Sequence, residues 1–126
     1  MIPVILESPY SGNLEQNLRY ARSCMLDSIN HGEAPFLSHL LYTQIFDDSI
    51  PHERDFGMNA GFVWLRLAAR SVVYTNLGIS TGMECGIQKA REYGIEIIYR
   101  RLSTDLMSAL DINLAADNLP LNGNHC

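Results

Sequence analysis

The chain has 126 residues, of which 47% are hydrophobic and 18% charged, so we expect one soluble globular domain with a single core. Its formal net charge of −5 argues against the broad positive surface that binds a nucleic-acid polymer. No apolar run approaches the roughly 20 residues that cross a bilayer, and the first residues lack the basic lead of a signal peptide. We therefore expect a cytoplasmic protein whose partners include neither a nucleic-acid polymer nor a membrane.

The cysteines and histidines show no pattern typical of a disulfide framework or a metal site. The three cysteines are an odd number without paired spacing, which favours a reducing compartment. The four histidines are not spaced as metal ligands, either with one another or with the cysteines. The sequence predicts no metal site.

The first half of the chain alternates strand and helix patterns. The uninterrupted apolar residues within 3–7 predict a short buried strand, and the loop 8–12 ends at Asn13, which can cap a helix that runs to Gly32. A second strand is expected at 36–38 after Pro35, and the segment 40–48 is ambiguous. Ser49-Ile50-Pro51 begins a second long helix, in which Gly57 and Gly61 cost stability unless another element packs closely against them.

The second half continues the alternation. The β-branched run at 71–75 predicts a third strand, which is followed by the loop Asn76-Leu77-Gly78 and the helix start Ser80-Thr81-Gly82. That helix is expected to end near Gly94, before a fourth strand at 95–99. A terminal helix at 102–116 and a flexible tail at 117–126 complete the prediction.

This order of elements predicts the fold class. Strands that alternate with helices indicate α/β structure: a single Rossmann-like three-layer domain over 1–116, with a mainly parallel sheet of 4-5 strands flanked by helices. Ligands of such sheets bind outside the carboxyl ends of the strands, where the strand order reverses. The rule selects the loops 8–13, 38–42, 76–80 and 100–101.

These loops supply the candidate ligand-binding residues. An aromatic ring can stack on a nucleobase or simply pack, and the small hydroxyl side chains can bind a sugar or phosphate or cap a helix. A histidine at the cleft edge can bind a ligand or be structural. The candidates are Ser8, Pro9, Tyr10, Ser11, His39, Asn76, Gly78, Ser80, Thr81, Gly82 and Met83.

Two short motifs carry a family resemblance. They are Glu7-Ser8-Pro9-Tyr10-Ser11 after the first strand and Gly82-Met83-Glu84-Cys85-Gly86 at the start of the third helix. With the order of elements over 1–101, they resemble the nucleoside 2-deoxyribosyltransferase-like family. The resemblance implies that a carboxylate nucleophile, here Glu84, attacks the anomeric carbon of a nucleoside or nucleotide and releases the base, without a cofactor. From the segment alone, the simpler interpretation is that Glu84 only complements the helix dipole, as acidic first-turn residues often do.

One departure from the family leaves a second function open. Many family enzymes carry an aspartate after the third strand, where this chain has Asn76, and an amide cannot act as an acid or base near neutral pH. The alternative is a non-catalytic protein that sequesters a nucleotide immune signal, such as a cyclic dinucleotide or an ADP-ribose derivative. The compact size and the opening loop resemble phage-encoded members, which act in the host cytoplasm. We also expect a homodimer or higher even oligomer built on the second helix, which carries Phe62 and Trp64.

Overall fold

The computed structural model of the chain describes residues 1–112 and forms an α/β domain on one four-stranded sheet. The strands, in the spatial order β2-β1-β3-β4, are all parallel. The structure confirms the predicted class. The strands are β1 (Ile2–Glu7), β2 (Glu33–Phe36), β3 (Arg70–Tyr74) and β4 (Glu96–Arg100), and the helices are α1 (Leu14–Asn30), α2 (Ser38–Leu41), the short 3-10 helix η1 (Tyr42–Gln44), α3 (Pro51–Leu67), α4 (Thr81–Glu92) and α5 (Thr104–Leu110).

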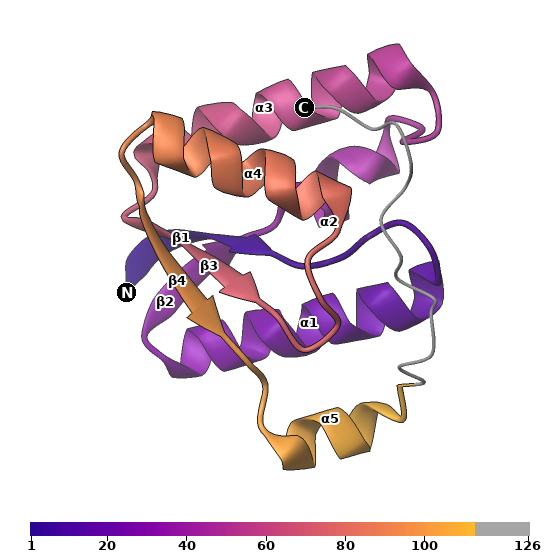
Figure 1. Ribbon diagram of the computed structural model, residues 1–126, viewed down its shortest axis with the longest axis vertical. Helices are drawn as coiled ribbons and strands as arrows, with labels where there is room; N and C mark the ends of the chain where they lie inside the picture. Colours follow the sequence, from indigo (N-terminus) through magenta and orange to yellow (C-terminus); the bar gives the residue numbers. More distant parts are fainter. Residues whose placement is uncertain (113–126) are drawn as a thin grey trace.

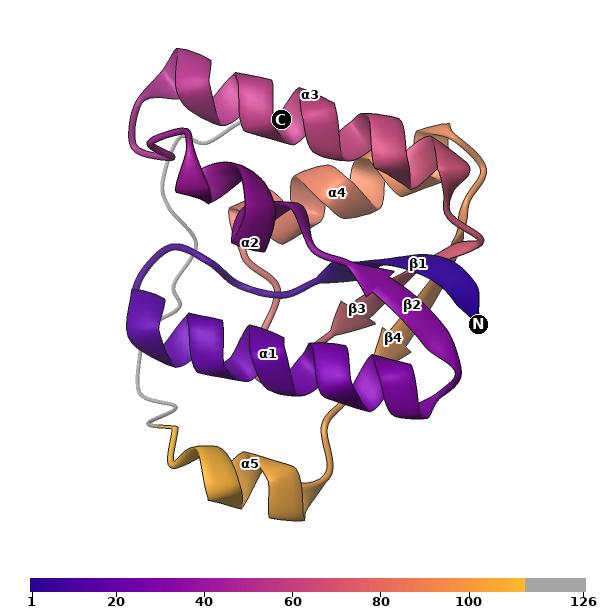
Figure 2. The same ribbon diagram turned by 180° about the vertical axis from the view of Figure 1, so that it is seen from behind.

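The domain has three layers. Helices α2, α3 and α4 cover one face of the sheet, and α1 covers the other with α5 beyond it (Figures 1 and 2). Successive side chains of a strand point to opposite faces, and β1 follows this rule. Val4 and Leu6 join the core under α1, whereas Ile5 joins the core under α3 and α4. The same alternation sends Glu7, the last residue of β1, to the α3–α4 face.

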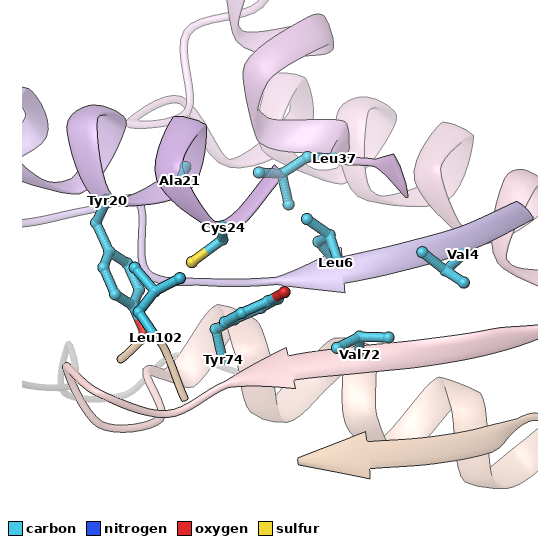
Figure 3. Close-up of a cluster of buried hydrophobic side chains, with 9 residues drawn as sticks. All are labelled: Val4, Leu6, Tyr20, Ala21, Cys24, Leu37, Val72, Tyr74 and Leu102. Atoms are coloured by element: carbon cyan, nitrogen blue, oxygen red, sulfur yellow. The ribbon is translucent and has the colours of Figure 1, made fainter. Parts of the chain in front are cut away.

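The core under α1 is the larger of the two. Its buried side chains come from α1, from β1 and β3 and from the segments that follow β2 and β4, and they meet between the helix and the sheet (Figure 3). Tyr20, Val72 and Tyr74 are fully buried in it. Burial of this apolar surface holds α1 in place and fixes the loops at both of its ends.

A polar network crosses the same interface. Glu33 is 1% exposed, and Arg100 donates to both of its carboxylate oxygens, at 2.8 and 2.9 Å. Ser28 donates to Glu33 at 2.7 Å, and Tyr74 accepts from Arg100 and donates to Asp27. The Arg100 guanidinium outweighs burial and holds the pKa of Glu33 below its usual value. Arg100 therefore ties β4 to β2 across the sheet, although it ends a strand at the edge where ligands bind.

The glycines of α3 allow the helix to lie close to α2 and η1. A Cβ at Gly61 would lie 2.9 Å from the Cβ of Ser38, and one at Gly57 would lie 3.5 Å from the Cβ of Tyr42. The close packing expected from these two glycines thus exists within the chain itself.

Two elements differ from the sequence prediction by more than one residue. The strand expected at 36–38 spans Glu33–Phe36 instead, because β2 is an edge strand and an edge strand tolerates Pro35. His39 consequently lies in the short helix α2 and not at a strand end. The last helix is shorter than predicted, with the bounds Thr104–Leu110. The rest of the predicted domain, 113–116, and the predicted tail, 117–126, lie outside the described residues.

Candidate functional site

A pocket lies at the carboxyl ends of β1 and β2, on the face covered by α3 and α4. The chain leaves β1 to form β2 on one side and returns as β3 on the other, so the strand order reverses beside β1. This reversal is where ligands of open parallel sheets bind. The pocket is closed by the first turn of α4 and by the α3 residues that face the sheet.

The pocket wall combines hydroxyl groups with apolar side chains. Hydroxyls come from the loop after β1, from α2 and from the start of α4, while isoleucine, leucine, methionine and aromatic side chains form the apolar part of the wall. The cavity measures about 110 Å³ and adjoins an outer hollow of about 570 Å³, which by itself reaches the size of a small-molecule site. The hydroxyl residues are Ser8, Ser11, Ser38, Ser80 and Thr81, and the large apolar residues are Ile5, Phe36, Met58, Phe62, Leu65 and Met83.

His39 is held neutral at the inner wall. Its Nε2 lies 3.0 Å from the Ser8 carbonyl oxygen and 3.2 Å from the Ser8 hydroxyl, so Nε2 carries the proton and donates to Ser8. Burial lowers the pKa of His39 to about 4. Its Nδ1 is buried without a hydrogen-bond partner among the described residues and is free to accept a hydrogen bond.

Glu7 is a pocket residue that the sequence analysis did not single out. It lines the cavity, partly buried, and burial raises its pKa to about 8, so the carboxyl is protonated at neutral pH. None of the hydrogen bonds or ion pairs found within residues 1–112 involves its side chain. The available signal was the alternation of β1, since a residue two positions after the buried Ile5 faces the same side of the sheet.

The outer hollow is acidic. Its wall includes Asp47, Asp48 and Asp55, and Arg54 lines both the hollow and the inner pocket. Burial raises the pKa of Asp48, against the opposing effect of the Arg54 charge. A ligand in this hollow meets more acidic than basic side chains.

The structure brings together most of the predicted ligand residues. Pro9 is a buried residue of the loop after β1, and Tyr10 faces the outer hollow, with its ring 5.3 Å from the ring of His39. The predicted residues that line the inner pocket are Ser8, Ser11, His39, Ser80, Thr81, Gly82 and Met83.

Asn76, Gly78 and Glu84 do not line the pocket. The Asn76 side chain accepts from the Leu102 backbone N–H at 2.8 Å and donates to the Leu102 carbonyl at 3.1 Å, and it also accepts from the Tyr20 hydroxyl. It thereby ties the loop after β3 to the segment after β4. Gly78 is exposed in a turn with φ of 85°, and Glu84 is exposed on the first turns of α4.

No helix within residues 1–112 is long and apolar enough to cross a bilayer. In the same part of the chain, no group of three or more His, Cys, Asp or Glu side chains is arranged to hold a metal ion.

The chain belongs to a family described only as a domain of unknown function (DUF7768), whose model matches residues 2–100. The matched region covers all four strands and α1 to α4, and therefore the whole pocket. None of the curated proteins searched matches the chain.

Proposed function

We propose that this protein binds a nucleoside or a nucleoside monophosphate in the pocket beside β1 and cleaves or transfers its N-glycosidic bond. The observation that carries the proposal is the pocket wall, which mixes hydroxyl groups with aromatic and methionine side chains at the reversal of strand order. The resemblance of the loop after β1 and of the α4 start to the nucleoside 2-deoxyribosyltransferase-like family supports the same class of ligand.

The chemistry of the wall matches the two parts of a nucleoside. Serine hydroxyls donate and accept, as sugar hydroxyls do, and Ser8, Ser11 and Ser38 offer them together. Phe36 and Phe62 provide apolar surface for the faces of a base. Tyr10 extends this aromatic surface into the outer hollow.

The charges of the site limit the number of phosphates. The first turn of α4 can receive one phosphate, because its backbone N–H groups and the helix dipole favour an anion. The three aspartates of the outer hollow would repel a longer phosphate chain. The site therefore favours a nucleoside or a monophosphate over a triphosphate.

A second function, sequestration of a nucleotide signal without turnover, is favoured by one specific observation. The two positions that the family resemblance assigns to catalysis, Glu84 and Asn76, do not line the pocket. Under this alternative the protein holds its ligand intact.

Binding and mass spectrometry test both functions together. The purified chain is incubated with common ribo- and deoxyribonucleosides and with their monophosphates and triphosphates. We expect nucleosides or monophosphates to raise the melting temperature more than triphosphates do, and free base to accumulate. Tyr10→Ala should weaken binding by about 1–3 kcal/mol, the range for stacking on a base. Tyr99→Ala, which removes a half-exposed tyrosine from the edge strand β4 outside both hollows, is the matched control.

The outcomes separate the candidates. Accumulation of free base supports turnover, and recovery of an unchanged bound ligand supports sequestration. If none of these compounds shifts the melting temperature at millimolar concentration, the proposed function is refuted. Sequestration is refuted if cyclic dinucleotides and ADP-ribose also leave the melting temperature unchanged.

A further inference from the structure

Glu7 and Gly86 form a matched pair at the bottom of the pocket. Glu7 ends β1 in the middle of the sheet, paired with Val73 of β3, and Gly86 lies one turn into α4. A Cβ built on Gly86 would clash with the Glu7 carboxyl group, lying only 2.6 Å from its Cδ and 2.9 Å from its Oε1. The carboxyl group therefore occupies the space that any side chain at position 86 would fill.

The fold leaves this carboxyl available for a ligand. Elsewhere in the same domain, the buried carboxylate of Glu33 is satisfied by both nitrogens of Arg100 and by Ser28. Glu7 has no such partners among the described residues, and it lines a pocket open to solvent. Fully buried acids are hydrogen-bonded within the protein, as Glu33 is, whereas the partly buried carboxyl of Glu7 keeps its donor and acceptors for whatever enters the pocket.

The other titratable and charged groups at the pocket do not compete with Glu7 for the ligand. His39 of α2 is neutral and uses Nε2 to hold Ser8. Asp48 and Arg54 lie together on the side toward the outer hollow, where the Arg54 charge acts on Asp48. Glu84 of α4 lies outside the pocket.

We propose that Glu7 is the catalytic acid of this pocket, that it protonates the base as the N-glycosidic bond breaks, and that the reaction does not need Glu84 as a nucleophile. This inference rests on the proposed function. The electron pair of the C–N bond leaves with the base nitrogen, which takes the proton of the Glu7 carboxyl. Water then adds to the anomeric carbon and gives one proton to the Glu7 carboxylate, which restores the acid. The net reaction is nucleoside plus water to sugar plus base.

The raised pKa of Glu7 supports this assignment. With a pKa of about 8, the group carries its proton at neutral pH, as a general acid must. An exposed glutamate near its ordinary pKa would be ionised under the same conditions.

The test compares isosteric variants of the full chain for base release from the nucleosides and monophosphates above, and for binding. Glu7→Gln should bind within about threefold of wild type and lose about 10²- to 10⁴-fold in base release, the usual contribution of a general acid. Glu92→Gln, at the far end of α4, is the control and should stay within about twofold of wild type. Glu84→Gln represents the competing mechanism, and we expect it to retain activity.

Two more measurements keep the test decisive if Glu7→Gln folds poorly. Gly86→Ala keeps the acid but displaces it, and should reduce base release at least about tenfold while the protein still binds nucleoside. The wild-type rate should fall about tenfold per pH unit above the pKa of Glu7, as expected for a required acid.

The possible results distinguish this inference from the proposed function. Base release that survives in Glu7→Gln, or that is lost only in Glu84→Gln, overturns the role of Glu7 while the proposed function stands. Nucleoside binding by the wild type without any base release also overturns it. If the wild type binds no nucleoside at all, the proposed function fails and the role of Glu7 fails with it.

Discussion

The buried carboxyl of Glu7 should make the stability of the protein depend on pH in a way that one substitution removes. Its pKa is raised from 4.5 to about 8 by burial, so the folded state holds a proton that the unfolded chain releases near pH 4.5. Glu7→Gln keeps the size of the side chain and its capacity to hydrogen-bond, but it cannot ionise. The variant and the wild type should therefore differ in stability by an amount that varies with pH.

The sign and size of this difference follow from proton linkage. Below pH 4.5, Glu7 is protonated in both states and costs nothing. Between pH 4.5 and about 8 only the unfolded chain has lost the proton, so the free energy of unfolding falls by about 1.4 kcal/mol per pH unit. Across that window the loss is on the order of 4–5 kcal/mol, and above it there is no further loss.

Urea unfolding of both proteins between about pH 4 and about pH 9 measures this directly. Every other titrating group is shared, so its contribution cancels in the difference between the two proteins. We expect Glu7→Gln to match the wild type at the acid end and to become more stable by at least about 2 kcal/mol at the alkaline end. A difference that stays constant with pH would show that Glu7 is not buried in its protonated form.

Three further predictions concern packing, the loop after β3 and assembly. Gly86→Ala should lower the free energy of unfolding of the wild type by about 1–3 kcal/mol, because the added methyl group overpacks against Glu7. In a Glu7→Ala background the same substitution should raise the free energy of unfolding by about 0.5–1 kcal/mol, because there alanine only favours the helix; equal effects in both backgrounds would disprove the contact. Asn76→Asp should destabilise by about 1–3 kcal/mol at neutral pH, because an oxygen replaces the donor to the Leu102 carbonyl; an unchanged urea midpoint would contradict this. Trp64 is 47% exposed on α3, and we expect Trp64→Ser to dissociate the homo-oligomer, which light scattering would detect as a lower molar mass. A wild-type protein that already measures 14.2 kDa would refute the expected oligomer.

The face of α3 on which the oligomer prediction depends is apolar in the structure. Phe56, Val63 and Leu67 are more than half exposed along the helix, next to Trp64. The glycines of the same helix are already covered by α2 and η1, so they are not available for a close approach between subunits. An interface here would use these large side chains instead.

The layers of the fold could be predicted from the sequence, because the local signals that begin helices and form strands recur along the chain. Asn13 caps α1 by accepting from the Gln16 backbone N–H, and the Ser80 hydroxyl accepts from the Met83 N–H at the start of α4. The alternation of apolar strands with amphipathic helices then predicts a covered parallel sheet. Such signals depend on neighbours within a few residues, so they can be read without tertiary structure. The edge strand β2 was misplaced because its proline is tolerated only by virtue of its position in the sheet.

The chemistry of the site was decided by contacts between residues far apart in the sequence. Ser8 and His39 meet because β1 and β2 are neighbours and end at the same edge of the sheet. Asn76 stands in a conspicuous loop, yet its hydrogen-bond partners are Tyr20 and Leu102, which no local pattern connects to it. Motif position alone cannot tell whether a polar side chain faces a ligand or satisfies the backbone, because both need the same donors and acceptors.

Glu7 and Gly86 show the same limit most clearly. In the sequence, Glu7 begins one of the two resemblance motifs and Gly86 ends the other, and no local pattern connects the two residues. Only the packing of α4 against β1 places the carboxyl in the space left by the missing side chain. The same packing reduces the contact of the carboxyl with water and raises its pKa. Burial is a property of the assembled layers, so the protonation state of Glu7 could be derived only from the tertiary structure.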